Sequence, residues 1–245
     1  LEEVVRLRFL VPPLAMVALP VALVLKQPDL GTAVLLVAGA GAIFFLAGVR
    51  LWKFALVIAA AGGAVPLAWN FLRDYQKERI LTFLDPERDP LGAGYHILQS
   101  KIALGSGGTF GKGFMQGTQS HLSFLPERQT DFIFTMLAEE FGMVGGLAML
   151  GLYTLLLAYG VAIALRCRNH FGRLLAMGVT TTVFLYVFIN VAMVTGLIPV
   201  VGVPLPLISY GGTAMMTIMV AVGLLMSVYV HRDVEIARRA SGEAD

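Results

Sequence analysis

Six long apolar runs constrain the fold of this 245-residue chain more than any other feature. A helix needs about 20 mostly apolar residues to cross a membrane, because it rises ~1.5 Å per residue and the hydrocarbon core is ~30 Å thick. The runs are Phe9–Leu25, Leu30–Val49, Leu51–Leu72, Phe141–Leu165, Leu174–Val201 and Thr213–Val230. The sequence therefore predicts an all-α polytopic membrane protein with six transmembrane helices in this chain.

The composition supports this class and excludes others. Charged residues make up 14% of the chain and the mean hydropathy is +0.78, whereas soluble domains carry about 25% charged residues. The net charge is only +2 and there is no basic block, so we expect no nucleic-acid partner. Cys167 is the single cysteine, which excludes an internal disulfide.

One long polar region, residues 73–131, separates the third and fourth apolar runs. It holds seven basic and seven acidic residues and is not of low complexity. Tyr95, Leu98 and Ile102 recur at helical spacing, which predicts a short amphipathic helix on the membrane surface. Gly105–Gly113 predicts a flexible turn. Loops of this length are usually functional or disordered, and the aromatic and aliphatic content favours function.

Lysine and arginine gather on one side of the predicted membrane. By alternation of the six runs, that side carries ten basic residues: Arg6, Arg8, Arg50, Lys53, Arg166, Arg168, Arg173, Arg232, Arg238 and Arg239. The short segments on the other side carry only Lys26. Because basic loops stay in the cytoplasm, both ends of the chain are predicted to be cytoplasmic. Residues 1–245 then form a single membrane domain whose large loop, 73–131, faces the periplasm or the cell exterior.

The large loop ends at Asp131, where polar residues give way abruptly to apolar ones. Phe141–Leu165 is long enough to span the membrane alone, so Thr130–Glu140 is predicted to be a helical approach at the outer interface. Thr130 or Asp131 would cap that helix, and from spacing alone a simple cap is the plainer role for Asp131. The alternative is a general base that takes a proton from an attacking hydroxyl. Glu139 is most simply an interfacial charge, as is Glu140.

Two further segments on the outer side are candidates for function. Asp29 stands at the start of a run and is most simply a helix cap. The stretch from Ile198 to Gly212 is uncharged and too rich in proline and glycine for a regular helix. Irregular backbone at membrane depth is tolerated only where it is buried or lines a cavity, so this stretch is either a groove wall or a tight re-entrant turn.

Four motifs in order resemble the SEDS family of bacterial shape, elongation, division and sporulation proteins. They are Gln27–Thr32 (QPDLGT), Asp85–Lys101 (DPERDPLGAGYHILQSK), Gly117–Phe134 (GTQSHLSFLPERQTDFIF) and Asn190–Gly212 (NVAMVTGLIPVVGVPLPLISYGG). Within the family the last two motifs are more similar to the RodA branch than to the FtsW branch. Family members are polytopic proteins of the bacterial inner membrane.

The resemblance implies a peptidoglycan glycosyltransferase that polymerises lipid II and releases polyprenyl pyrophosphate. The family's key acidic residue falls on Asp131, as general base or as a group that orients the acceptor or a bound cation. We expect Arg128, Lys101 and Arg73 near the pyrophosphate, and Glu127 and Gln119 near sugar hydroxyls. A cofactor is not specified; a divalent cation such as Mg²⁺ would need carboxylate or phosphate oxygens. Expected partners are a class B penicillin-binding protein and other elongation-complex membrane proteins.

The family has about ten spans, and this chain supplies six. The sequence therefore reads as the C-terminal part of a SEDS protein, and we expect this part alone to be inactive. Two other functions stay open: a lipid II flippase, whose interrupted spans suit transport, and a non-catalytic scaffold for a penicillin-binding protein. Only the glycosyltransferase needs a carboxylate base at the outer surface, and Asn190 is the main polar residue in the middle of the last three spans.

Overall fold

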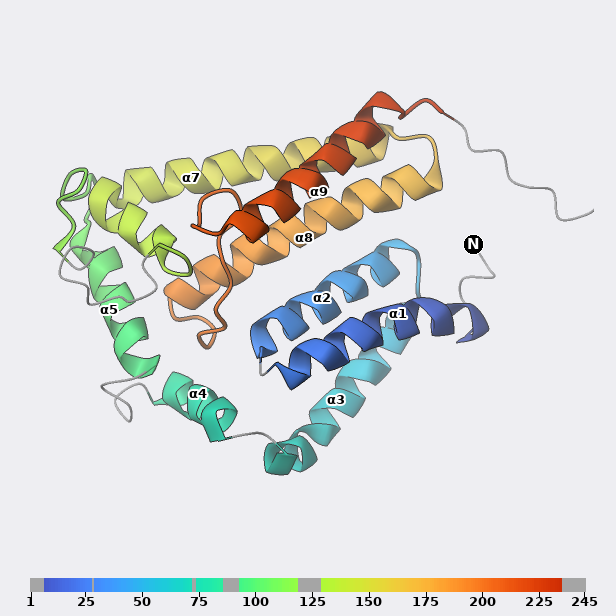
Figure 1. Ribbon diagram of the computed structural model, residues 1–245, viewed down its shortest axis with the longest axis horizontal. Helices are drawn as coiled ribbons and strands as arrows, with labels where there is room; N and C mark the ends of the chain where they lie inside the picture. The colour runs from blue at the N-terminus through green and yellow to red at the C-terminus, as the bar shows by residue number, and fades with distance from the viewer. Residues whose placement is uncertain (1–6, 28, 72–73, 86–92, 119–128, 235–245) are drawn as a thin grey trace, which may run out of the picture.

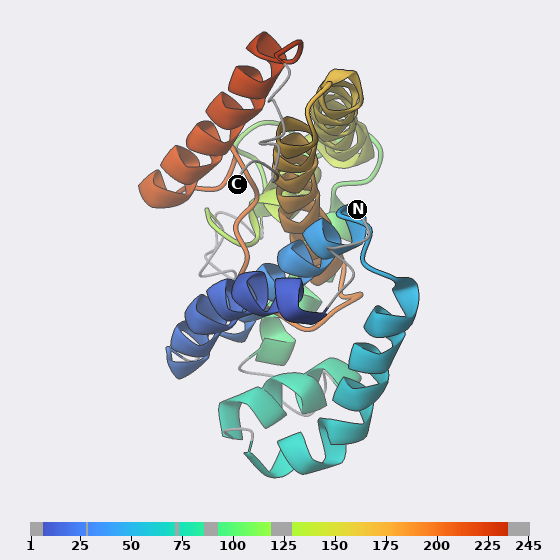
Figure 2. The same cartoon turned by 90° about the vertical axis from the view of Figure 1, so that its right-hand side faces the viewer.

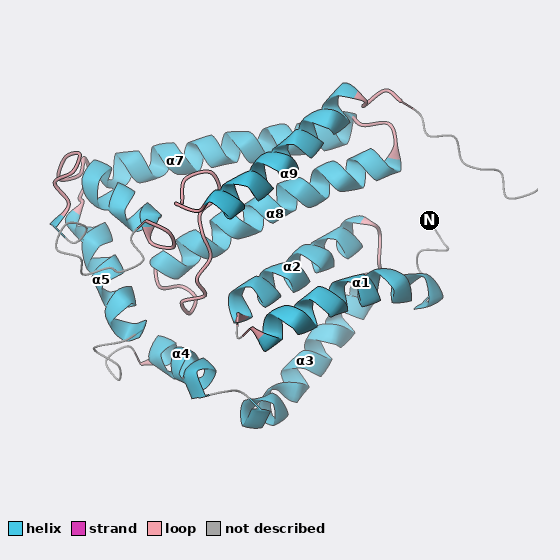
Figure 3. Ribbon diagram, viewed as in Figure 1, coloured by secondary structure: helices cyan, strands magenta, loops and turns pink. Residues whose placement is uncertain are grey.

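Helices account for nearly all of the regular structure in the computed structural model (Figures 1 and 3), which describes residues 7–27, 29–71, 74–85, 93–118 and 129–234. Those residues contain no strand. Their helices are α1 (Leu7–Lys26), α2 (Leu30–Leu46), α3 (Leu51–Phe71), α4 (Asp74–Leu84), α5 (Ala93–Ser106), α7 (Ile133–Arg166), α8 (His170–Val194) and α9 (Gly212–Val230). The all-α prediction is confirmed for the described part of the chain.

Each of the six apolar runs forms a helix. α7, α8 and α9 are long and apolar enough to cross a membrane, while α1, α2 and α3 supply shorter apolar stretches. The fifth run was predicted to continue to Val201, which is wrong: α8 ends at Val194. Gly196 adopts a φ of +74° there and Pro199 follows, so the helical hydrogen bonds cannot continue.

α8 lies at the centre of the molecule and packs against α7, α9 and α2. α1 covers α2, and α5 packs against the beginning of α7. The views in Figures 1 and 2 place α3 and α4 at the periphery, away from the α7–α9 bundle. The principal core joins α7, α8 and the segment that precedes α9; its buried residues are Phe132, Phe134, Met149, Tyr153, Val183, Val187, Met193, Val194 and Leu205.

Large apolar side chains remain exposed along the long helices, as a lipid-facing surface requires. On α7, Leu147, Leu152 and Leu155 are each more than half exposed. A soluble protein rarely exposes such a continuous apolar surface. The helices therefore have the exterior of a polytopic membrane protein.

Polar caps begin two of these helices. Asp29 accepts hydrogen bonds from the backbone N–H and the hydroxyl of Thr32, at 3.0 and 2.6 Å. This confirms the predicted role of Asp29 as the cap of α2. Asn169 caps α8 in the same manner, by accepting from the N–H of Gly172.

α7 is broken at Gly142, whose φ of +68° and ψ of −164° are not helical. The break divides α7 into a short segment, residues 133–141, and a long apolar segment, residues 143–166. This confirms the prediction that a separate helical approach precedes the fourth apolar run. The turn after α5 packs against the break, so Gly105–Gly113 is a tightly hydrogen-bonded turn and not the loose one that its glycines suggested.

The helix predicted around Tyr95, Leu98 and Ile102 is present as α5. Its buried face carries Ile97, Ser100 and Ala103, which pack toward α7 and α8. Leu98 and Ile102, which define the predicted apolar face, are exposed. α5 thus buries one face in the protein and leaves a second, apolar face open.

Candidate functional site

Asp131 lies in a turn immediately before α7. The helix begins at Ile133 and its N-cap residue is Phe132, which makes no side-chain capping hydrogen bond. The prediction that Thr130 or Asp131 caps this helix is therefore wrong. Phe132 and Phe134 are buried in the principal core, and Asp131 beside them is half-buried.

Three consecutive carbonyl groups hold this turn in place. The carbonyl of Gln129 accepts from the N–H of Tyr210 at 2.8 Å. The carbonyl of Thr130 accepts from the hydroxyl of Ser209 at 2.6 Å. The carbonyl of Asp131 accepts from the side-chain amide of Asn190 at 2.7 Å. These bonds use backbone oxygens, so they fix the position of the backbone at Asp131.

Asn190 joins three elements although it lies inside an apolar helix. It is fully buried on α8 and also donates to the carbonyl of Val203 at 2.6 Å. Both acceptors are carbonyls, which settles which end of the amide carries the nitrogen. The sequence marked Asn190 only as a polar exception in an apolar run, and the partners of that amide are a finding of the structure.

The carboxylate of Asp131 lies against Gly202. A Cβ atom built on Gly202 would stand 3.4 Å from Oδ2 of Asp131. Gly202 has a φ of +75°, a conformation that favours glycine. The missing side chain therefore gives the carboxylate room at this point of the turn.

All four sequence motifs meet at the segment between α8 and α9, residues 195–211. A Cβ on Gly31 would collide with the carbonyl of Val201, and a Cβ on Gly196 would collide with the side chain of Lys101. Asp131 lies against Gly202 in the same segment. Residues separated by more than 150 positions in the sequence therefore converge on one irregular segment, which we call the convergence turn.

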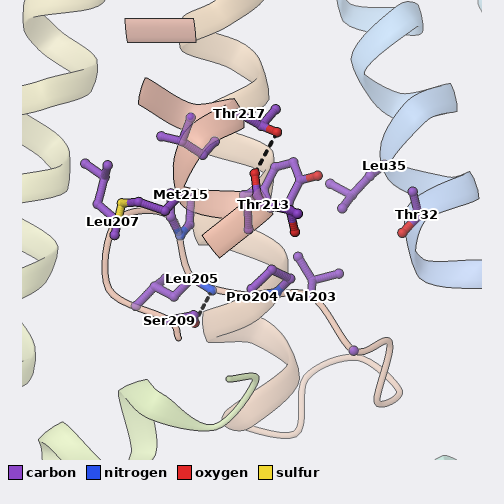
Figure 4. Close-up of a pocket in the computed structure, with 15 residues that line it drawn as sticks. Thr32, Leu35, Val203, Pro204, Leu205, Leu207, Ser209, Thr213, Met215 and Thr217 are labelled. Atoms are coloured by element: carbon purple, nitrogen blue, oxygen red, sulfur yellow. Dashed lines mark hydrogen bonds between the residues drawn. The ribbon is translucent and has the colours of Figure 1, made fainter. Parts of the chain in front are cut away.

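The convergence turn is also the wall of a cavity of about 270 Å³ (Figure 4). α2 contributes Thr32 and Leu35 to the opposite side, and α9 contributes Thr213 and Thr217. The turn is held by Ser209, whose hydroxyl accepts from the N–H of Leu205 at 2.7 Å. Tyr153 on α7 adds a hydrogen bond to the carbonyl of Pro206. Of the two roles left open for this stretch, the structure favours the groove wall.

An apolar groove of about 330 Å³ continues from this cavity along α2. It is bounded by α1, α2 and α8 and shares Thr32, Leu35 and Tyr186 with the cavity. The remaining lining is almost entirely apolar and includes Leu36, Ile43, Phe44 and Leu185. A cavity with several polar side chains, beside the Asp131 turn, is thus continuous with an apolar groove.

Of the five predicted substrate-binding residues, the structure describes only Lys101. It lies on α5 and its ammonium end contacts Gly196, so Lys101 and Asp131 touch the same turn. Arg73, Gln119, Glu127 and Arg128 lie outside the described residues. Within the described ranges, no three His, Cys, Asp or Glu side chains gather closely enough to hold a metal ion.

Sequence reasoning missed the polar groups that position the site. Ser209 and Tyr153 gave no signal beyond being polar residues in apolar surroundings. Ser100 and Thr135 are both fully buried and hydrogen-bond each other at 2.8 Å, and Ser100 also donates to the carbonyl of Val194. These contacts tie α5 and α7 to the end of α8.

Comparison with known proteins places these features in a family. Residues 2–234 match the family model FTSW_RODA_SPOVE, described as cell cycle protein. The peptidoglycan glycosyltransferase MrdB of Escherichia coli K12 is 53% identical over 222 residues, which cover 89% of this chain and 60% of that protein. The chain therefore spans less than two thirds of the length of this relative.

Two solved structures share the fold. One belongs to a peptidoglycan synthase complex that coordinates polymerization and crosslinking, with a TM-score of 0.77, 35% identity, and coverage of 94% of this chain and 63% of that one. The other is the rod shape determining protein RodA of Thermus thermophilus, with a TM-score of 0.62, 30% identity, and coverage of 94% and 59%. The four motifs, the convergence turn and these matches agree: the chain belongs to the FtsW, RodA and SpoVE family of cell cycle proteins.

Proposed function

We propose that the full-length protein is a peptidoglycan glycosyltransferase that polymerises lipid II for cell elongation, with Asp131 as its general base. The observation that carries the proposal is the hold on Asp131: three backbone bonds fix the turn while Gly202 leaves room beside the carboxylate. The 53% identity to a protein named as a peptidoglycan glycosyltransferase supports the reaction class.

In the proposed reaction, the 4-hydroxyl of the acceptor sugar attacks the anomeric carbon of the donor from the side opposite the pyrophosphate. The new C–O bond forms as the bond to the pyrophosphate oxygen breaks, which inverts the anomeric configuration. The hydroxyl proton passes to the Asp131 carboxylate, and polyprenyl pyrophosphate leaves with the bonding electron pair. Lys101, at the same turn, supplies positive charge for the leaving group.

The apolar groove along α2 suits the polyprenyl chain of a lipid-linked sugar. The groove adjoins the cavity behind the convergence turn, so a chain in the groove would bring its pyrophosphate toward the turn. Glu127 and Gln119 would bind the hydroxyl groups of the sugars. Arg128 and Arg73 would lie near the pyrophosphate. This part of the proposal follows from the family resemblance and the chemistry of the side chains.

The membrane arrangement is part of the proposal. Six spans in residues 1–245 form one membrane domain of a bacterial inner-membrane protein, with both ends of this chain in the cytoplasm and residues 73–131 outside. A class B penicillin-binding protein would crosslink the glycan that this protein makes. The similarity to a chain of a polymerization and crosslinking complex supports such a partner.

The experiment that tests the function uses the full-length protein, purified with its penicillin-binding partner and supplied with lipid II. We expect wild-type protein to yield glycan polymer and Asp131→Asn to yield none, with normal folding and partner binding. Product from the Asn variant at the wild-type level would contradict the base. If instead the wild type moves lipid II across vesicles without polymerising it, the protein is a flippase.

A further inference from the structure

The turn after α5 forms hydrogen bonds with the backbone groups on both sides of the break in α7. In an uninterrupted helix, the N–H groups of Met143 and Val144 would donate to the carbonyls of Glu139 and Glu140. At the break, Met143 donates instead to Gly108 at 2.9 Å, and Val144 donates to Thr109 at 3.1 Å. The turn thus satisfies both of the donors that the break leaves without helical acceptors.

The same turn satisfies the two carbonyls. Glu139 accepts from the N–H of Lys112 at 3.1 Å, and Glu140 accepts from the N–H of Gly113 at 3.0 Å. Two helical hydrogen bonds are therefore replaced by four bonds to residues 108–113. The short segment of α7 is held by this turn and not by helical continuity with the long segment.

Two glycines allow so close a contact. A Cβ atom on Gly107 would collide with the carbonyl of Ala138, and one on Gly111 would collide with the carbonyl of Glu140. Gly111 also has a φ of +80°. The glycine-rich sequence of this turn is thus explained by backbone packed directly on backbone.

An ion pair also joins the turn after α5 to the short segment of α7. Nζ of Lys112 lies 2.7 Å from Oε1 of Glu139, whose side chain is only 1% exposed against 26% for that of Lys112. Thr118 joins both groups, accepting from Lys112 at 2.8 Å and donating to Glu139 at 3.2 Å. A buried carboxylate is costly unless it is paired, so this pair sets a definite position for the turn on the helix.

We infer that Lys112 and Glu139 are positioning residues for Asp131, an inference that rests on the proposed function. The short segment of α7 is a rigid rod of nine residues, with the Asp131 turn at one end and Glu139 near the other. The carbonyl contacts described above hold the first end, and the ion pair with its four backbone bonds holds the second. Loosening the second end tilts the rod and moves the carboxylate relative to the acceptor sugar.

The test measures steady-state lipid II polymerisation by the full-length protein with its partner. We expect Glu139→Gln and Lys112→Met to lower kcat about 10- to 100-fold with KM for lipid II unchanged, because displacements near 1 Å cost about 100-fold in rate. Lys112→Met should be the worse of the two, since it removes the positive charge that lies 2.7 Å from a buried carboxylate. Lys112→Arg, which keeps the charge, should retain kcat within about threefold.

Controls separate positioning from stability. Lys77→Met and Glu78→Gln make the same charge changes on α4 and should leave kcat unchanged, and every rate is normalised to folded protein measured by thermal melting and gel filtration. Wild-type kcat per folded molecule in Glu139→Gln and Lys112→Met, or a change in KM alone, would overturn the inference.

The same assay also tests Asp131 as the proposed base, through the variant Asp131→Asn. An inactive Asp131→Asn together with normal ion-pair variants would overturn only the positioning role. A fully active Asp131→Asn would overturn the base itself.

Discussion

Two carboxylates stand at opposite ends of the short segment of α7, and the protein holds them in opposite ways. Glu139 is fully buried, and its carboxylate is fixed by the ammonium group of Lys112. Asp131 is half-buried, and its backbone carbonyl accepts a hydrogen bond from the side-chain amide of Asn190. Glu139 is thus anchored through its side chain, and the turn that carries Asp131 is anchored through its backbone.

This difference separates a structural role for Glu139 from the proposed catalytic role of Asp131. A buried carboxylate that is paired with an ammonium group cannot lose that pairing without destabilising its surroundings. The turn at Asp131 is held by bonds to its backbone carbonyls, so its position does not depend on the pair between Lys112 and Glu139 alone. Replacing Asn190, Ser209 or Gly202 tests the turn that holds Asp131, and replacing Asp29 tests a cap outside that turn; the expected loss of stability falls in that order.

Replacing Asn190 should have the largest effect. Asn190→Leu leaves the carbonyls of Asp131 and Val203 without their donor in a fully buried site. Each unsatisfied group costs about 1–3 kcal/mol, so we expect a loss of about 3 kcal/mol in unfolding free energy together with most polymerase activity. Thermal melting in detergent measures the first. Thr195→Val removes hydroxyl bonds within its own helix end and serves as the control; equal losses would contradict a specific role for Asn190.

Ser209 should matter next. Ser209→Ala removes the bond to Thr130 and leaves the N–H of Leu205 unsatisfied in a buried turn. We expect a loss of about 2 kcal/mol in stability, with reduced kcat because the Asp131 turn loosens. Ser106→Ala removes a hydroxyl that donates to the carbonyl of Ala103 within its own helix and should be nearly neutral. An unchanged melting temperature in Ser209→Ala would show that the turn is held by other contacts.

Gly202 tests the space beside the carboxylate. Gly202→Ala forces a side chain into a backbone with φ of +75° and places it 3.4 Å from Oδ2 of Asp131. The strain costs about 1–2 kcal/mol, and crowding of the carboxylate should lower kcat more than melting temperature. Gly48→Ala, with φ of +92° and open space around it, carries the strain without the crowding. Equal kcat in the two variants would contradict the need for room at Gly202.

Asp29 should give the smallest effect. Asp29→Ala removes the cap of α2, which is worth about 1 kcal/mol, and should leave kcat unchanged because a cap takes no part in proton transfer. Melting temperature and polymerisation are measured on the same sample. Asn169→Ala removes the cap of α8 and should lose a similar amount of stability. A loss of kcat in Asp29→Ala well beyond that of the Asn169 variant would show that Asp29 does more than cap.

The sequence predicted the parts that depend on local pattern. The apolar runs predicted the positions of the long helices, and the position of Asp29 at the start of a run predicted that it caps α2. Phe141–Leu165 is long enough to cross the membrane alone, and this length predicted that the residues before it form a separate helical segment. Each of these depends on spacing and composition within one stretch of chain.

The missing parts depend on contacts between distant stretches. Nothing in the run containing Asn190 indicates that its amide binds the carbonyl of Asp131, 59 residues earlier. The pairing of Lys112 with Glu139 was equally hidden. Glu139 was predicted to be an interfacial charge, which is wrong because its side chain is buried and paired with Lys112. The cap prediction at Asp131 failed because burial of Phe132 and Phe134 in the core decides where α7 begins.

The most direct test compares Asp131→Asn with Glu139→Gln in the full-length protein, using matched amounts of folded sample and saturating lipid II. The Asn variant should bind lipid II normally and form glycan at least about 1,000-fold more slowly, as expected for loss of a general base. The Gln variant should keep a slower but measurable rate. Normal glycan synthesis by Asp131→Asn, or a greater loss in Glu139→Gln, would contradict the assignment of the chemistry to Asp131.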